Sequence, residues 1–176
     1  RSRGLGDVYK RQNVNNNISA NVHFCKTGYV YLDAILNVVY EKAIENDIDF
    51  SVDCKDNLSF VAGDDLAVLI GNLADNAVEA LAKEQNKKLK ISIFQNGSYG
   101  VLNVQNYCSS SVLQTNPTLY TSKEDKKNHG RGISIVKSIA EKYGGDVVIS
   151  EKNNEFIVSV ILDNRIFTKN PLFLPD

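Results

Sequence analysis

The sequence has few residues of the kinds that build disulfide or zinc sites. It contains three cysteines and two histidines. Cys25, Cys54 and Cys108 are widely separated and form no CxxC pair. An odd, scattered set of cysteines does not frame a disulfide scaffold, and two histidines do not complete a zinc site. We therefore expect a chain suited to the reducing cytosol, and we place the domain in the cytoplasm.

An excess of charge of one sign is also absent, because 20 Lys and Arg stand against 21 Asp and Glu. A nucleic-acid or anionic-membrane binder would need a basic surplus, so we expect neither partner. No apolar run approaches the roughly 18 residues of a membrane span, and no signal peptide is visible. The hydrophobic content of 43% and the length of 176 residues suffice for the core of one domain.

The two ends of the chain lack the periodicity of the middle. Residues 1–12 (RSRGLGDVYKRQ) resemble translated adapter sequence, and the asparagines that follow are typical of a linker. We therefore interpret 1–17 as a non-native or linker tail, 18–163 as the folded domain and 164–176 as a loosely ordered tail.

Helical and strand-like patterns alternate within the domain. Apolar spacing of three and four residues predicts three helices, at Tyr29–Asn46, Asp64–Lys83 and Arg131–Tyr143. Alternation predicts five strands, at Ile48–Cys54, Leu89–Gln95, Val101–Asn106, Asp146–Ser150 and Phe156–Leu162. This order indicates an α+β fold, with helices on one face of a mixed sheet. A loop of about 24 positions, Tyr107 to Gly130, is longer than compact domains usually tolerate without a functional reason.

The first candidate site lies in the second predicted helix. Asn72 and Asn76 are four residues apart, so both amides project from the same side of the helix. Asparagine is a poor helix former, and its amide oxygen is a suitable ligand for Mg²⁺. The helix alone leaves open that this is a solvated polar edge.

The second candidate site is the sequence His129-Gly130-Arg131-Gly132-Ile133, directly before the third helix. The free N–H groups at a helix start bind anions, and glycine lets phosphate approach the backbone closely. Taken alone, the motif is equally compatible with a simple turn between loop and helix. Likewise, the lysines of the preceding loop are compatible with a solvated charge run.

Taken together, NLADNAVEA (72–80) and TSKEDKKNHGRGISIVKSIAEKYGG (121–145) closely resemble the N box and the second glycine box of GHKL ATPases. The nearest branch resembles the Agr- and VirS-type histidine kinases of peptide quorum sensing. The resemblance covers Lys26 to Leu162 and implies a Bergerat-type two-layer sandwich, with a mixed, mostly antiparallel sheet of about five strands and three helices on one face. It also implies that ATP and Mg²⁺ bind.

The resemblance assigns roles to individual residues. Asn76 matches the Mg²⁺-coordinating asparagine, and Asn72 matches the upstream residue that faces the phosphates. Residues 107–130 would form the ATP lid. The nucleotide would also contact a larger set from the lid and glycine box: Thr121, Ser122, Lys123, His129, Gly130, Arg131, Gly132 and Ile133.

One departure from the family pattern concerns the adenine contact. Most GHKL proteins carry an aspartate in a DxGxG box, whereas this chain has Asn106 there and lacks both glycines. An amide oxygen still accepts a hydrogen bond from the adenine amino group, but more weakly than a carboxylate. A non-catalytic nucleotide-sensing module is therefore an alternative.

Asn72 bears on the reaction class, because relatives that hydrolyse ATP or phosphorylate serine carry a glutamate at that position. An amide cannot act as a base, whereas a neutral imidazole acceptor already offers a lone pair. Asn72 at this catalytic position thus favours a histidine kinase over an anti-sigma-type serine kinase. His23 lies in a strand-like stretch, so we expect the acceptor histidine on a separate dimerisation helix. A response regulator would then be the downstream partner, and the parent protein would be membrane-anchored.

Overall fold

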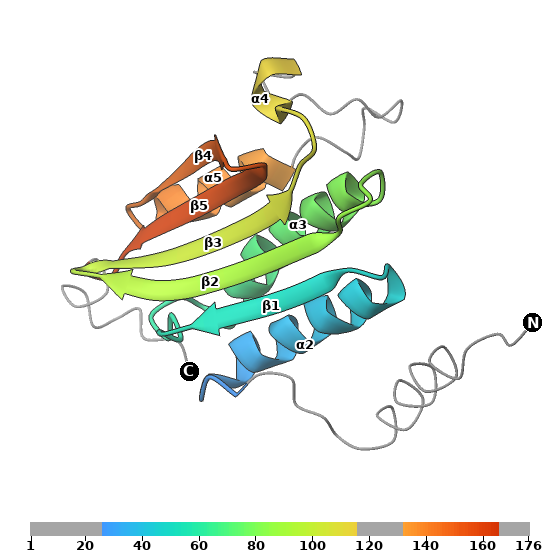
Figure 1. Ribbon diagram of the computed structural model, residues 1–176. Helices are drawn as coiled ribbons and strands as arrows, with labels where there is room; N and C mark the ends of the chain where they lie inside the picture. The colour runs from blue at the N-terminus through green and yellow to red at the C-terminus, as the bar shows by residue number, and fades with distance from the viewer. Residues whose placement is uncertain (1–25, 116–131, 166–176) are drawn as a thin grey trace, which may run out of the picture.

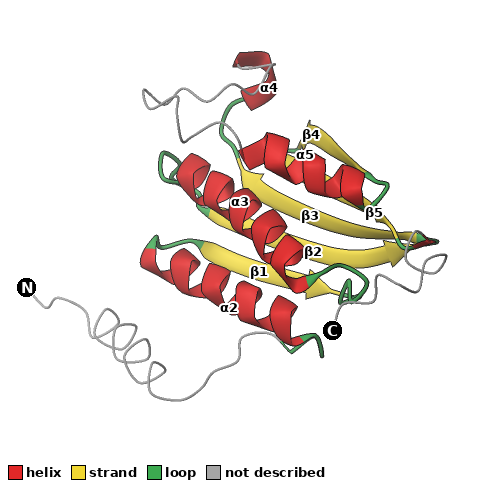
Figure 2. Cartoon of the chain, turned by 180° about the vertical axis from the view of Figure 1, so that it is seen from behind, coloured by secondary structure: helices red, strands yellow, loops and turns green. Residues whose placement is uncertain are grey.

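The computed structural model describes residues 26–115 and 132–165, which fold into two layers. A five-stranded sheet forms one layer, and helices α2, α3 and α5 cover one of its faces (Figures 1 and 2). The helices are α2 (Val30–Glu45), α3 (Gly63–Leu81), the short α4 (Val112–Thr115) and α5 (Gly132–Lys142). The strands are β1 (Asp49–Cys54), β2 (Lys88–Asn96), β3 (Tyr99–Tyr107), β4 (Asp146–Lys152) and β5 (Glu155–Asp163).

The strands lie in the order β1-β2-β3-β5-β4. The pair β1–β2 is parallel, and the other three pairs are antiparallel. A tight turn at Gly97, with φ of +60°, joins β2 to β3. The predicted α+β architecture, with a mixed and mostly antiparallel sheet and three helices on one face, is therefore confirmed.

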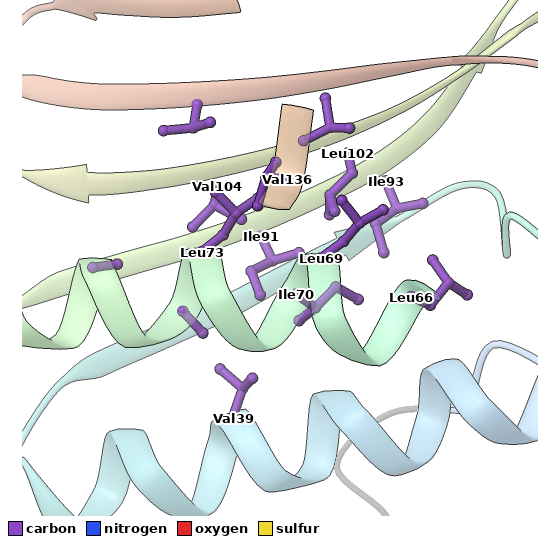
Figure 3. Packing of buried hydrophobic residues seen from close by; sticks show 14 of the residues in the cluster. Val39, Leu66, Leu69, Ile70, Leu73, Ile91, Ile93, Leu102, Val104 and Val136 are labelled. Atoms are coloured by element: carbon purple, nitrogen blue, oxygen red, sulfur yellow. The ribbon is translucent and has the colours of Figure 1, made fainter. Parts of the chain in front are cut away.

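The hydrophobic core lies between the sheet and the helices, and it is formed by alternate residues of the strands and by the apolar stripe of α3. Even-numbered residues of β3 and odd-numbered residues of β2 point toward the helices, and α3 supplies Leu66, Leu69, Ile70 and Leu73. Figure 3 shows these side chains packed with Val136 of α5 and Val39 of α2. Each of these side chains is at most 2% exposed, and α3 lies between α2 and α5 as the central helix of the layer (Figure 2).

A polar link fixes the end of α5 against the start of α3. The hydroxyl of buried Tyr143 donates to Asp65 Oδ2 at 2.6 Å and accepts from the backbone N–H of Ala62 at 2.9 Å. Burial and the bond to Asp65 raise the pKa of Tyr143 above its ordinary value, so the hydroxyl remains a donor. Lys142 also pairs with Asp65, at 2.6 Å. These contacts set how α3 and α5 lie relative to each other.

Two regions differ from the sequence expectation. Tyr107 belongs to β3, and Val112–Thr115 forms α4, so the predicted loop is not wholly irregular. In the predicted tail, the N–H of Asn164 donates to Ser98 O at 2.9 Å, and Arg165 pairs with Asp163 at 2.7 Å. The tail predicted to be loose from residue 164 is thus tied to the sheet over its first two residues.

Candidate functional site

The two asparagines of α3 lie one turn apart at the edge of its buried stripe. Asn72 is half-buried and Asn76 is exposed. The amide nitrogen of Asn72 donates to Val68 O at 2.7 Å, one turn back along the helix. This bond occupies one end of the Asn72 amide and leaves Oδ1 directed toward the start of α5.

Gly132, the first residue of α5, lies directly against both amides. A Cβ added to Gly132 would lie 3.2 Å from Asn72 Oδ1, 3.5 Å from Asn76 Nδ2 and 3.8 Å from Asn76 Oδ1. The helix start therefore lies in close contact with the asparagine pair, and a side chain at Gly132 would require the Asn72 amide to give by a few tenths of an ångström. The two motifs, far apart in sequence, converge at one place in the fold.

This arrangement combines two kinds of group that suit a metal-bound phosphate. The first N–H groups of α5 have no partner within the helix, and the helix dipole favours an anion beside them. The amide oxygens opposite are neutral, hard ligands of the kind that Mg²⁺ accepts together with phosphate oxygens and water. The residues present therefore fit Mg²⁺ and a phosphate chain between α3 and α5.

Asn106, which the sequence predicts as the adenine contact, lies at the end of β3 on the helix-covered face. Its side chain is 6% exposed, and its amide nitrogen donates to Tyr107 O at 3.1 Å. Across the sheet it pairs with Leu89 on one side and Phe156 on the other. Asn106 is therefore a buried amide between two apolar residues, Leu89 and Phe156.

The remaining predicted site residues are only partly described. Ile133 packs against the core beside Gly132. Residues Thr121, Ser122, Lys123, His129, Gly130 and Arg131 lie outside the described residues. Within 26–115 and 132–165, no cluster of three His, Cys, Asp or Glu side chains could hold a metal. None of the helices in these ranges is long and apolar enough to cross a membrane.

A hollow of about 480 Å³ lies on the opposite face of the sheet. Its lining includes Asp53, Ser92, Phe94 and Asn103, whose positions alternate with the buried, helix-facing ones. The sheet separates this hollow from Asn72 and Gly132, so the two are distinct features.

Sequence reasoning missed two acidic residues that bind the segment after β3. Glu151 of β4 accepts hydrogen bonds from the start of α4, and Glu84 accepts from Ser109. A local signal existed for α4 itself, because Ser111 and Gln114 match the first and fourth positions of a capping box. The N–H of Gln114 does donate to Ser111 Oγ, at 3.1 Å. No local signal could have identified the carboxylate partners.

Comparison with known proteins identifies the family of this fold. The sequence profile of the GHKL domain matches residues 63–163, more than half of the chain and the part that carries both motifs. A search of curated proteins found no match.

Several solved histidine kinase structures are similar in fold. The catalytic domain of histidine kinase ThkA, in a nucleotide-free form, is 20% identical with a TM-score of 0.62, over 76% of this chain and 90% of that one. The mycobacterial sensor histidine kinase MprB is 16% identical with a TM-score of 0.57, over 76% of this chain and 93% of that one. Histidine kinase AdeS of Acinetobacter baumannii is 15% identical with a TM-score of 0.57, and the match spans 76% of this chain and 63% of the AdeS chain. At these identities the likeness shows the fold.

Proposed function

This chain belongs to the GHKL domain family, and from this premise we propose that it is the ATP-binding catalytic domain of a sensor histidine kinase. Its substrate is Mg-ATP, and its product is a phosphohistidine on a dimerisation helix. The observation that carries the proposal is the close approach of Gly132 to Asn72 and Asn76. It supports the proposal because N–H groups at a helix start bind anions, and the amide oxygens opposite are suitable ligands for Mg²⁺.

Each side of the site has its own role in this proposal. Asn76 holds Mg²⁺ through its amide oxygen, and the α5 start with the glycine box donates to the phosphates. Asn106 accepts from the adenine amino group. The ATP lid and glycine box contribute the remaining nucleotide contacts, from Thr121, Ser122, Lys123, His129, Gly130, Arg131 and Ile133. When bound, Mg²⁺ neutralises phosphate charge and polarises the transferred group.

Phosphoryl transfer to histidine depends more on the positioning of ATP and the acceptor than on general acid–base catalysis. The bond between the γ-phosphorus and the bridging oxygen breaks, a phosphorus–nitrogen bond forms to imidazole, and ADP leaves; the imidazole proton passes to solvent. Asn72 cannot take a proton, so the position at which hydrolytic relatives carry a glutamate offers no base to water or to a serine hydroxyl. Histidine is the acceptor that needs least help, because its neutral ring already presents a lone pair.

The wider setting of the domain follows from the same proposal. The acceptor histidine lies on a separate dimerisation helix, and the phosphoryl group then passes to a response regulator. The sequence resemblance favours a quorum-sensing kinase of the Agr or VirS type, with the domain in the cytoplasm and the parent protein in the membrane.

The proposal is tested by measuring phosphoryl transfer from ATP, bound to this domain, to a separately expressed dimerisation helix. The domain is mixed with Mg-ATP labelled in the γ-position and a separately expressed histidine-bearing dimerisation helix from a related kinase. Acid-labile, base-stable label on that helix is expected, and none with Asn76→Ala. Nucleotide binding without transfer would favour the non-catalytic sensing module. Acid-stable label on a serine substrate would favour the anti-sigma-type kinase.

A further inference from the structure

The chain that leaves β3 just after Asn106 is held in place by a carboxylate of β4. Glu151 Oε1 accepts from the backbone N–H of Val112 at 2.6 Å and from that of Leu113 at 2.9 Å. Its Oε2 accepts from the hydroxyl of Ser111 at 2.5 Å. Because α4 begins at Val112, this single carboxylate binds two of the N–H groups that the short helix cannot satisfy internally.

Other contacts fasten the same stretch on both sides. The N–H and the hydroxyl of Ser109 both donate to Glu84 Oε1, at 3.1 Å each. Glu84 follows the end of α3, the helix that carries the asparagine pair. The N–H of Cys108 donates to Asn154 O at 2.8 Å, in the turn between β4 and β5. Residues 108–113 are therefore tied to the segment that follows α3 on one side and to the β4–β5 hairpin on the other.

The position of Glu151 relates it to the proposed nucleotide site. Glu151 pairs with Phe156 across β4 and β5, and Phe156 pairs with Asn106 across β5 and β3, so the three residues form one row. At about 4.8 Å between strands, Glu151 is roughly 10 Å from Asn106. Figure 1 shows α4 just beyond the end of β3, on the side where α5 begins. Residues 108–113 thus lie at the end of the sheet where the nucleotide would bind.

We propose that Glu151 is a positioning residue for nucleotide binding, which holds the chain between Asn106 and α4 in the binding-competent conformation. The proposal rests on the proposed function and adds a residue that touches neither nucleotide nor metal. Without the carboxylate, the N–H groups of Val112 and Leu113 and the Ser111 hydroxyl lose their common partner. The segment then occupies the competent conformation for a smaller fraction of the time, and apparent affinity falls by that fraction.

A carboxylate suits this role because it accepts several hydrogen bonds at once and carries charge. Hydrogen bonds to a charged acceptor are shorter and stronger than neutral ones. The bond from Ser111, followed by those from Leu113 and Val112, holds the pKa of Glu151 below its ordinary value. Glu151 therefore remains ionised, and keeps these bonds, throughout the neutral range.

The experiment measures nucleotide affinity and amide exchange in the same set of variants. We expect Glu151→Ala to weaken Mg-ATP or Mg-ADP binding about tenfold, with a folded circular dichroism spectrum and faster hydrogen exchange at Val112 and Leu113. Glu151→Gln keeps one oxygen acceptor, so it should restore part of the affinity and part of the exchange protection. The matched control is Glu155→Ala, which removes an exposed carboxylate from the same hairpin and should bind like the unmutated domain.

The outcomes separate this inference from the proposed function. Unchanged affinity in Glu151→Ala, despite faster exchange at Val112 and Leu113, would overturn the positioning role. An equal loss in Glu155→Ala would also overturn it, because a general charge effect would then explain the result. A wild-type domain that binds no nucleotide would instead overturn the proposed function, and with it the positioning role of Glu151.

Discussion

Replacing Gly132 with alanine should separate nucleotide binding from stability. The added methyl group would lie 3.2 Å from Asn72 Oδ1, a few tenths of an ångström closer than an easy contact. To accommodate it, the Asn72 amide must give by a few tenths of an ångström. The change therefore acts on the asparagine pair and on the phosphate approach at the same time.

Gly132→Ala is expected to change the free energy of unfolding only slightly and to weaken nucleotide binding strongly. Alanine is better than glycine in a helix by up to about 1 kcal/mol, and the tight contact offsets part of that gain. The net change in the free energy of unfolding should thus stay within about 0.5 kcal/mol, or about 2 °C in Tm. Binding should fall much more, because a hydrogen bond to a charged phosphate contributes about 1.5–3 kcal/mol. Loss of one such bond corresponds to roughly a tenfold to hundredfold rise in Kd.

Thermal unfolding of the free domain and titration calorimetry with Mg-ADP measure the two quantities. Gly71→Ala is a matched control, because a Cβ at that helical position would meet nothing within 4 Å. That control should leave Kd unchanged and should raise the free energy of unfolding by about 0.5–1 kcal/mol. If Gly132→Ala keeps both the Tm and the Kd of the unmutated domain, the start of α5 is not where phosphate binds.

Further changes test other parts of the account. Tyr143→Phe should lower the free energy of unfolding, measured by chemical denaturation, by about 1–3 kcal/mol, because the Ala62 N–H and Asp65 lose their buried partner. A change below about 0.5 kcal/mol would contradict the proposed link between α3 and α5. Asn106→Asp should tighten ATP by about 1 kcal/mol, the difference between charged and neutral acceptors, and Asn106→Ala should weaken it; equal affinities would place the adenine contact elsewhere. Asn72→Glu should raise phosphate release about tenfold above a negligible background, by supplying a base; strong hydrolysis by the unmutated domain would remove the main argument for histidine as acceptor.

Much of the fold can be predicted from sequence because its signals are local. The stripe of Leu66, Leu69, Leu73, Ala77 and Leu81 indicates α3, and all of these residues are buried. Alternation in the five strands likewise locates the sheet to within two residues at each strand end. The convergence of Asn72 and Asn76 with Gly132 needs the family resemblance, because helical spacing alone does not say what faces the amides.

The contacts that could not be predicted join residues distant in sequence. Glu151 reaches the start of α4 across 38 to 40 positions, and Tyr143 reaches Asp65 across 78. Nothing in the local pattern around Glu151 distinguishes it from a solvated carboxylate on a hairpin. Helical periodicity predicts Tyr143 only as the last residue of a helix, whereas its burial and hydrogen bonds depend entirely on how α5 packs against α3.

The most direct test of the central claim is Mg²⁺-dependent nucleotide binding through Asn76. The Tm of the unmutated domain is measured with ATP, in the presence of Mg²⁺ and in the presence of a chelator, and the series is repeated with Asn76→Ala. At a nucleotide concentration of 100 times Kd, binding should stabilise the unmutated domain by about 2.7 kcal/mol with Mg²⁺ present. The Mg²⁺-dependent part of this shift should vanish in Asn76→Ala, while the Tm of the free domain does not fall, because alanine is the better helix former. The same Mg²⁺-dependent shift in both proteins would contradict the account.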